Sequence, residues 1–477
     1  MLDQGRIATP PHPDFLVLPT DKQGLLRSAV LRAFHASEKA EMELSYLGPV
    51  FSEGGEDQRL STGSYYTPVD ATQFFWDKFF GQSRDVVGDN LEEWITRTHF
   101  IEPAVGAGAL FFGLLLKLCD LGVSEHVLSK IRVDLCDINA AALKFLRDQV
   151  EQIERTVEFE FSNVEMIQSD FLRWKPNLAN GREFFVFANP PFVRNPPGSR
   201  WKNSFADFSE KALNLTQRDG FVAFIVPLSL CFSRDYSALR RQIRQDGRAF
   251  AFSNFDNIPD TLFKSGKPKS SNSNKANSQR CTVFTGVPSE RPSLQATRLL
   301  RWQAGERQTL LSGQPELIDI SRYAHDDQFP RPVSQDQVSG YGCGLRLGTL
   351  SDLVAPSGQH QVAVSAVARN FVGVRDTCSP GTNQFSFVTN QDRLRFLAAI
   401  STDQFLDHWL MLGDGFHVTR DNILSFPMTS ALAAVVESKL ECIARAWTNR
   451  VRYRSEKLNS GTIVTSYNFR SVMSAMA

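Results

Sequence analysis

The sequence has little that suggests a membrane protein, a secreted fold or a structural metal site. Its seven cysteines are scattered, with no C-x-x-C pair and no histidine at the spacing of a zinc ligand. Such cysteines favour a reducing compartment. The most apolar runs, 109–118 and 221–230, are about half as long as a bilayer span requires. The first residues lack the apolar segment of a signal peptide. We therefore expect a cytoplasmic protein with no membrane segment and no metal.

The chain also lacks net charge, because its 52 Lys and Arg residues balance its 52 Asp and Glu residues. A polyanionic partner would therefore have to meet a local basic surface and not the field of the whole molecule. The two halves of the chain nevertheless differ slightly in net charge. Residues 1–250 carry 33 acidic and 28 basic side chains, whereas residues 251–477 carry 19 and 24. The second half is thus the better candidate for a nucleic-acid surface.

The chain does have the length and composition for several cores, since 42% of its 477 residues are hydrophobic and 22% are charged. Residues 21–47 carry apolar side chains at helical spacing, which predicts an amphipathic helix packed on something larger. From residue 98, short apolar runs alternate with helical periodicity, which predicts a parallel sheet with helices on both faces. The expected strands are 98–101, 131–137, 164–169, 184–188 and 221–226, and the expected helices are 109–121, 140–153, 204–215 and 233–245.

These patterns divide the chain into three parts. Residues 1–60 are expected to form an N-terminal helical extension and residues 61–290 a catalytic domain. Residues 291–477 are expected to form a separate α+β domain, because the clear alternation is lost after residue 290. Within the catalytic domain, the segment from Lys264 to Arg280 has five basic residues and no acidic one. Its composition predicts a mobile loop.

The first expected strand ends in E-P-A-V-G-A-G (102–108), and a strongly apolar helix follows. Glycines at such a turn let the backbone approach a ligand, and the helix N-terminus offers free N–H groups. Phe111 occupies the third glycine position of the dinucleotide fingerprint, where a pyrophosphate would need open space. A cofactor without phosphates, such as S-adenosylmethionine, does not need that space, and Glu102 would suit its ammonium group. A tight turn without a ligand is the alternative.

Acidic residues also follow the next two strands. Asp137 ends the second strand, where a carboxylate can accept two hydrogen bonds from ribose hydroxyls. It could equally cap the helix that begins near residue 140. Asp170 follows the third strand and can accept from an adenine amine, with Phe171 beside the ring; a cap or a turn is an equally good interpretation. Three acids at three successive strand ends together favour a cofactor site.

The most informative segment is N-P-P-F (189–192), at the end of the fourth strand. Two prolines fix the backbone and remove two N–H donors, which leaves the Pro190 carbonyl and the Asn189 side-chain oxygen as acceptors. An exocyclic amine that donates to both loses conjugation with its ring, and its lone pair becomes available to attack a methylsulfonium carbon. Phe192 offers a face on which a planar base can stack. The first and fourth strands are neighbours in a doubly wound sheet, so the two sites lie together.

In this order, E-P-A-x-G-x-G, D-I-N, S-D-F and N-P-P-F, with Y-Y-T-P (65–68) upstream, resemble the gamma class of N6-adenine DNA methyltransferases from restriction-modification systems. The resemblance covers residues 60–290 closely. It implies the class I S-adenosylmethionine-dependent methyltransferase fold, a doubly wound and mostly parallel α/β sheet, followed by a C-terminal α+β target-recognition domain. The implied cofactor site comprises Tyr65, Thr67, Pro68, Glu102, Pro103, Ala104, Gly106, Gly108, Asp137, Ile138, Asp170 and Phe171, and the implied catalytic residues at the target base are Asn189, Pro190, Pro191 and Phe192.

The activity that the resemblance implies is site-specific methylation of the N6 amine of an adenine flipped out of double-stranded DNA, in restriction-modification or phage defence. We find no nuclease constellation in the sequence, so a restriction endonuclease or defence subunit would be a separate partner. The alternatives are a methyltransferase that acts on RNA or on a protein glutamine, and a catalytically silent DNA-binding subunit. The long C-terminal part favours DNA, and the intact N-P-P-F segment argues against a silent subunit.

Two details remain open at the level of sequence. The family places a second aromatic residue against the flipped base near the basic loop, and both Phe255 and Phe263 are candidates. Residues 412–419 have a weaker likeness to the recognition regions of type IIG-like enzymes, and a glycine turn that joins two helices is the alternative. His417, within that stretch, is expected to be structural and not catalytic.

Overall fold

The computed structural model describes residues 21–47, 67–88, 90–176, 183–257, 260–263, 279–303, 305–324, 328–338, 346–368, 370–376, 379–459 and 462–474. Tyr65 and most of the mobile loop expected between Lys264 and Arg280 fall outside these residues. Within the described ranges, no helix combines the length and the apolar character that a membrane span needs.

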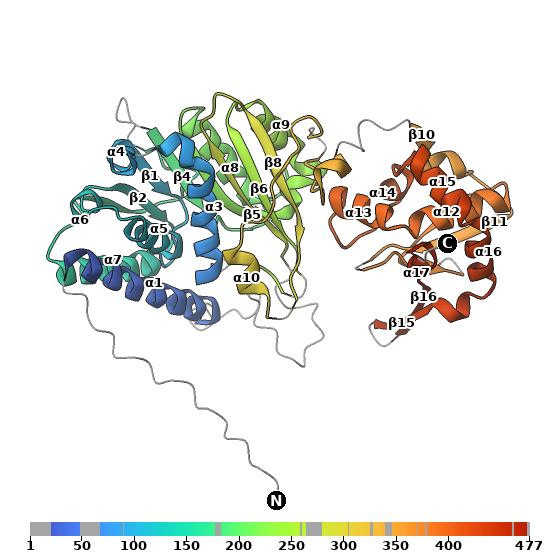
Figure 1. The fold of residues 1–477 in the computed structure, drawn as a ribbon. Coiled ribbons are helices and arrows are strands. Elements are labelled where there is room, and N and C mark those ends of the chain that lie inside the picture. The colour runs from blue at the N-terminus through green and yellow to red at the C-terminus, as the bar shows by residue number, and fades with distance from the viewer. Residues whose placement is uncertain are drawn as a thin grey trace, which may run out of the picture.

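A nine-stranded sheet organises the first part of the described chain, with the strand order β3-β2-β1-β4-β5-β7-β6-β8-β9 (Figure 1). β1 to β5 run parallel, and β7 lies antiparallel between β5 and β6. The order starts at β1 and extends outward on both sides, which is a doubly wound arrangement. The strands are β1 Thr98–Glu102, β2 Arg132–Asp137, β3 Asn163–Gln168, β4 Glu183–Ala188, β5 Phe221–Pro227, β6 Ala249–Phe255, β7 Cys281–Val287, β8 Ser293–Leu300 and β9 Ile318–Asp319.

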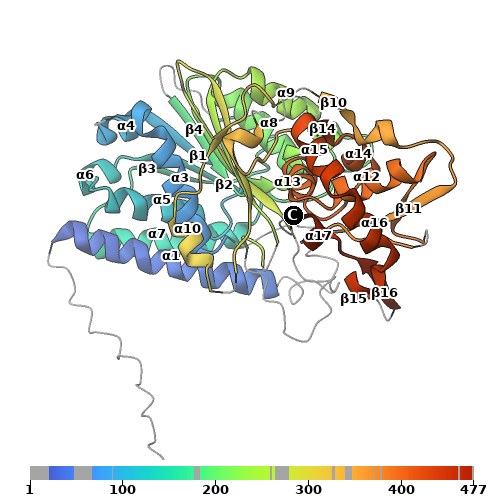
Figure 2. The same cartoon turned by 45° about the vertical axis from the view of Figure 1, so that its right-hand side comes forward.

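Helices pack around this sheet and on one another. α5 (Ala109–Asp120) is buried along most of its surface, because α1 (Lys22–Leu47) and α3 (Val69–Val87) cover it. α1 also lies along α7 (Ala140–Val157), as Figure 2 shows. The buried residues of α1 follow a helical period, which confirms the expected amphipathic helix; they are Leu26, Ala29, Val30, Ala33 and Phe34. The other helices are α4 Leu91–Arg97, α6 Glu125–Leu128, α8 Ser204–Thr216, α9 Ser237–Gln245 and α10 Arg307–Ser312.

The first core extends further along the chain than the sequence suggested. β8 pairs in parallel with β6, and β9 pairs with β8, so both strands belong to the first sheet. The buried apolar cluster of this domain runs from Leu26 to Phe329, and a second cluster begins at Leu350. The boundary expected after residue 290 therefore lies between Phe329 and Leu350. The alternation ends earlier because the chain adds edge strands through short connections, without a helix between β7 and β8.

The C-terminal domain is α+β, as the sequence suggested. A five-stranded antiparallel sheet has the order β13-β11-β12-β16-β15, and β10 and β14 form a separate two-stranded sheet. Helix α12 packs on β11 and β13. The strands are β10 Arg346–Thr349, β11 His360–Ser365, β12 Val374–Arg375, β13 Thr382–Phe387, β14 Pro427–Thr429, β15 Arg454–Asn459 and β16 Thr462–Tyr467, and the helices are α12 Asn390–Ile400, α13 Asp403–Leu412, α14 Arg420–Leu424, α15 Ser430–Ser438, α16 Leu440–Thr448 and α17 Arg470–Ser474.

Candidate active site

The motifs singled out in the sequence meet at one edge of the first sheet. Glu102 is the last residue of β1 and Asp137 the last of β2, while Asn189 directly follows β4. Because β2, β1 and β4 are parallel neighbours, their carboxyl ends lie side by side. Asp170 follows β3 at the same edge. In a doubly wound sheet this edge is where ligands bind.

The glycine turn after β1 is held against the end of β2. The Gly106 N–H donates to Oδ2 of Asp137 at 2.8 Å. Gly108, the N-cap of α5, has a φ of 92°, and a Cβ there would lie 2.6 Å from Cδ1 of Leu146. A side chain at position 108 would therefore collide with α7 as well as strain the backbone. The close packing explains why glycine is needed here even before a ligand is considered.

Asp137 is not the cap of the following helix. Asn139 takes that role, since its side chain accepts from the N–H groups of Ala141 and Ala142. Oδ1 of Asp137 accepts from the Asn139 N–H at 2.8 Å. Burial raises the pKa of Asp137, and backbone hydrogen bonds from Asn139 and Gly106 oppose the rise. A carboxylate can accept about four hydrogen bonds, so its oxygens retain capacity for a ligand.

In the turn after β3, the two expected site residues make local contacts. Asp170 accepts from the Leu172 N–H at 2.9 Å, which supports a turn role, and its other oxygen lies 3.5 Å from Nε of Arg173. The ring of Phe171 is buried against Phe208. Ile138, in contrast, is 74% exposed. The Phe171 ring, expected beside the cofactor ring, is thus not accessible, whereas Ile138, the other apolar residue of the implied cofactor site on this edge, is.

Lys211 supports this turn, which the sequence did not reveal. Its ammonium group donates to the carbonyls of Phe171 and Trp174 and lies 4.5 Å from the centroid of the Phe171 ring. Burial lowers the pKa of Lys211, and the nearby charge of Asp170 opposes the fall. A lysine on an amphipathic helix ordinarily faces water, so no pattern in the sequence points to this role.

The N-P-P-F segment lies next to the start of α3. Nδ2 of Asn189 donates to Oγ1 of Thr67 at 2.9 Å, and Pro68 is the N-cap of α3. The carbonyl of Pro191 accepts from Oγ of Ser204 at 2.6 Å. These contacts fix both ends of the segment and leave Pro190 at its centre.

Packing distinguishes the two candidates for the second aromatic residue. The rings of Phe192 and Phe263 have centroids 5.9 Å apart and planes inclined by 65°. Phe255 instead contacts Phe74 of α3, with centroids 5.2 Å apart. Phe263 is therefore the residue that faces the N-P-P-F segment.

Among the described residues, no group of His, Cys, Asp and Glu side chains could hold a metal ion. Cys136 is the cysteine of β2 beside Asp137, and burial raises the pKa of its thiol to about 12. A thiol with that pKa is protonated at neutral pH and is a poor nucleophile.

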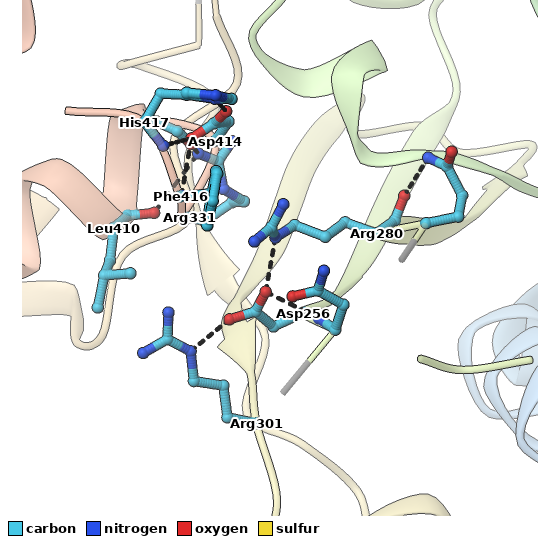
Figure 3. A network of polar contacts seen from close by, with 11 residues as sticks. Asp256, Arg280, Arg301, Arg331, Leu410, Asp414, Phe416 and His417 are labelled. Carbon is cyan, nitrogen blue, oxygen red and sulfur yellow. Dashed lines mark hydrogen bonds and ion pairs between the residues drawn. The ribbon is translucent and has the colours of Figure 1, made fainter. Parts of the chain in front are cut away.

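The C-terminal domain contacts the first domain through the turn after α13 (Figure 3). Arg331 donates its backbone N–H to the Met411 carbonyl at 3.0 Å, and its guanidinium donates to the carbonyls of Leu410 and Gly413. A buried cation thus caps the C-terminal end of the helix, where the carbonyls and the helix dipole favour positive charge.

A buried ion-pair network lies beside this turn (Figure 3). Asp256, directly after β6, accepts from Nε of Arg280 at 2.6 Å and from Nε of Arg301 at 2.5 Å. The Arg280 guanidinium also lies 5.5 Å from the centroid of the Phe416 ring, in the turn of the other domain. Asp256 therefore connects the end of β6 to the domain interface.

Residues 412–419 form a glycine turn between α13 and α14, the simpler of the two interpretations. Gly415 has a φ of 73°, and a Cβ there would lie 2.7 Å from Cδ2 of Leu299 in the first domain. Nδ1 of His417 pairs with Oδ2 of Asp414 at 2.5 Å, and the His417 carbonyl accepts from Nε1 of Trp409. His417 closes the turn, in agreement with a structural role.

The chain matches no family model and no curated protein. It is similar to the solved structure of the Type IIL restriction-modification enzyme MmeI in complex with DNA, at 13% identity and a TM-score of 0.52, over 83% of this chain and 73% of that chain. A DrdV–DNA complex matches at 12% identity and a TM-score of 0.47, over 69% of this chain and 38% of that chain. The type I restriction-modification system methyltransferase subunit from Streptococcus thermophilus matches at 15% identity and a TM-score of 0.36, over 55% of this chain and 52% of that chain.

These likenesses concern the fold. The likeness to MmeI, together with the strand order and the antiparallel β7, gives the class I S-adenosylmethionine-dependent methyltransferase fold, followed by an α+β domain. The chain spans less than two fifths of the length of the DrdV chain.

Proposed function

We propose that this protein is a site-specific DNA methyltransferase that transfers a methyl group from S-adenosylmethionine to the N6 amine of an adenine flipped out of double-stranded DNA. One arrangement carries the proposal. The Asn189 amide and the Phe192 ring, with Phe263 opposite, lie at the end of β4, directly beside the glycine turn at the end of β1. An amine acceptor, a base-stacking surface and a cofactor turn thus share one edge of the sheet.

The residues present fit S-adenosylmethionine. Glu102 is a buried acid at the end of β1, suited to an ammonium group, and Asp137 retains capacity to accept from ribose hydroxyls. Gly106 and Gly108 keep side chains away from the turn between them. Ile138 offers an apolar face for an adenine ring. When bound, S-adenosylmethionine supplies an electrophilic methyl group.

The residues of β4 would prepare the target amine. The side-chain nitrogen of Asn189 donates to Thr67, so the amide oxygen is the atom that would accept from the target amine. The Pro190 carbonyl is the second acceptor, because the next carbonyl, that of Pro191, already accepts from Ser204. Two hydrogen bonds from the amine hold its lone pair out of conjugation and aim it at the methyl group. Positioned polar groups of this kind act mainly on the chemical step.

The two aromatic rings imply movement when a base enters. A base stacked between them would need their planes about 7 Å apart, twice a contact distance of about 3.5 Å. The centroids of Phe192 and Phe263 are 5.9 Å apart, and the rings touch edge to face. The Phe263 side chain must therefore turn aside, while Phe192 is held by the proline segment.

DNA is the acceptor that the arrangement of domains favours. The C-terminal α+β domain contacts the first domain beside Asp256, close in the chain to the Phe263 segment. In the similar MmeI structure the enzyme is in complex with DNA. The C-terminal domain would read the sequence, and a nuclease or defence subunit would be a separate partner in restriction-modification or phage defence.

The proposal is tested by offering tritium-labelled S-adenosylmethionine together with one of three acceptors: unmethylated genomic DNA, total RNA or a protein extract. We expect label in DNA alone. Label in RNA or protein alone would reassign the substrate, and tight binding of S-adenosylmethionine with no transfer to any acceptor would favour a silent DNA-binding subunit.

A further inference from the structure

The guanidinium group of Arg307 joins two segments on either side of the proposed base site. Its Nε and Nη2 donate to the two carboxylate oxygens of Asp70, at 2.8 and 3.0 Å. Its Nη1 donates to the Thr261 carbonyl at 2.9 Å, and Nη2 also donates to the Leu262 carbonyl at 2.6 Å. Arg307 begins α10, a helix that packs on α3. Only 14% of its side chain is exposed.

These contacts complete a closed path around the site. Asp70 lies in the first turn of α3, three residues after Thr67, whose hydroxyl holds the Asn189 amide. On the other side, Leu262 precedes Phe263, whose ring meets Phe192. The path from Asn189 to Phe192 therefore passes through α3, Arg307 and the 260–263 segment.

Arginine is suited to this position in a way that lysine is not. One planar group donates four hydrogen bonds to three residues, and it also lies 5.3 Å from the centroid of the Trp302 ring. A lysine ammonium is a compact charge on a flexible stem and cannot reproduce the bidentate pair with Asp70 together with both carbonyl contacts.

We infer that Arg307 is a positioning residue that holds the backbone of the Phe263 segment in register with α3 and Asn189. The inference rests on the proposed function. A base can enter only if the Phe263 ring turns aside, and a fixed backbone at Leu262 returns the ring to the same place. Arg307 thus serves the target-base site from α10, a segment that contributes no strand to the parallel part of the sheet.

The experiment compares Arg307→Met and Arg307→Lys with Arg97→Met. Arg97 makes another arginine–carboxylate pair, 3.2 Å from Glu183 at the opposite end of β4, and is the matched control. Amide hydrogen exchange of residues 260–263 is measured first, since it needs no activity. We expect Arg307→Met to speed this exchange by about tenfold, Arg307→Lys to have a smaller effect, and Arg97→Met to have none. Exchange in both Arg307 variants that matches the control would overturn the inference.

Methyl transfer to unmethylated DNA provides the second readout. We expect a fall in kcat of about tenfold for Arg307→Met and a partial recovery in Arg307→Lys. In a Phe263→Ala background the same change should have little further effect, because Arg307 acts through that ring. Fully multiplicative losses would overturn the inference. A wild-type protein without methyl transfer, but with the exchange effect, would refute the proposed function, and only the anchoring of residues 260–263 by Arg307 would stand.

Discussion

The side-chain amide of Asn189 donates to the Thr67 hydroxyl across 2.9 Å, although 122 residues separate the two in the chain. The resemblance assigned Thr67 to the cofactor and Asn189 to the target base. In the folded protein, one hydrogen bond joins the two. Its direction assigns the amide nitrogen to Thr67 and leaves the role of acceptor to the amide oxygen.

Thr67→Val tests this relationship with little change of shape. The substitution removes the acceptor for Nδ2 of Asn189, so the amide can rotate and present the wrong group to the target amine. One neutral hydrogen bond of this kind contributes about 1 kcal/mol, so we expect kcat to fall by roughly three- to tenfold. Affinity for S-adenosylmethionine, measured by titration calorimetry, should change much less than kcat. A large loss of affinity with normal kcat would place Thr67 at the cofactor and not at the amide.

Asp137→Ala should weaken S-adenosylmethionine binding by about 1–3 kcal/mol, the usual effect of losing hydrogen bonds to a charged acceptor. The binding of DNA without cofactor should stay unchanged. Asn139→Ala, which removes the cap of α7, is the matched control. It should lower stability and leave the affinity for S-adenosylmethionine nearly intact, whereas equal affinities for wild type and Asp137→Ala would refute the ribose contact.

The same carboxylate predicts a pH dependence of binding. Burial raises the pKa of Asp137. The ionised form accepts hydrogen bonds, so affinity is complete above this raised pKa and falls as pH falls through it. The decline should therefore begin at a higher pH than an ordinary aspartate would give. Calorimetric titrations from pH 8 downward should show it in wild type and not in Asp137→Ala.

Much of this site can be predicted from local sequence patterns, and particular residues show which parts cannot. Strand ends, glycine turns and N-P-P-F are local features, so their common edge could be predicted from the alternation alone. The choice of Phe263 over Phe255 depends on which ring faces the N-P-P-F segment, and no pattern in the sequence encodes that. The pair between Asp70 and Arg307 joins residues 237 apart, and Arg307 lies beyond the domain boundary expected at residue 290.

Asp256→Asn should loosen the contact between the domains. The buried carboxylate pairs with two arginines, and replacing it removes the negative charge that Arg280 and Arg301 share. Breaking a buried pair by removing one partner typically lowers the free energy of unfolding by about 3–5 kcal/mol. Urea unfolding should show that loss. Asp421→Asn is the control, because its pair with Arg234 is exposed and should contribute almost nothing. A wild-type unfolding curve for Asp256→Asn would contradict the account of the interface.

His408 predicts acid sensitivity in the C-terminal domain. Burial lowers its pKa from 6.5 to about 4. In the unfolded chain the imidazole takes up a proton below pH 6.5, whereas in the folded domain it stays neutral until pH 4. Stability is thus complete above pH 6.5 and declines as pH falls toward 4, by up to about 3 kcal/mol. His408→Phe should flatten this part of the stability profile. If the unfolding free energy fell by the same amount between pH 7 and pH 5 in wild type and in His408→Phe, the prediction would be contradicted.

The most direct test of the central claim is the chemical identity of the modified base. Unmethylated genomic DNA is incubated with S-adenosylmethionine and wild-type protein or Asn189→Ala, digested to nucleosides and analysed by mass spectrometry. We predict N6-methyladenine with wild-type protein, a rate lower by on the order of 10² or more with Asn189→Ala, and S-adenosylmethionine affinity within a few fold of wild type. Methylcytosine in place of N6-methyladenine, or near-normal turnover by Asn189→Ala, would contradict the account.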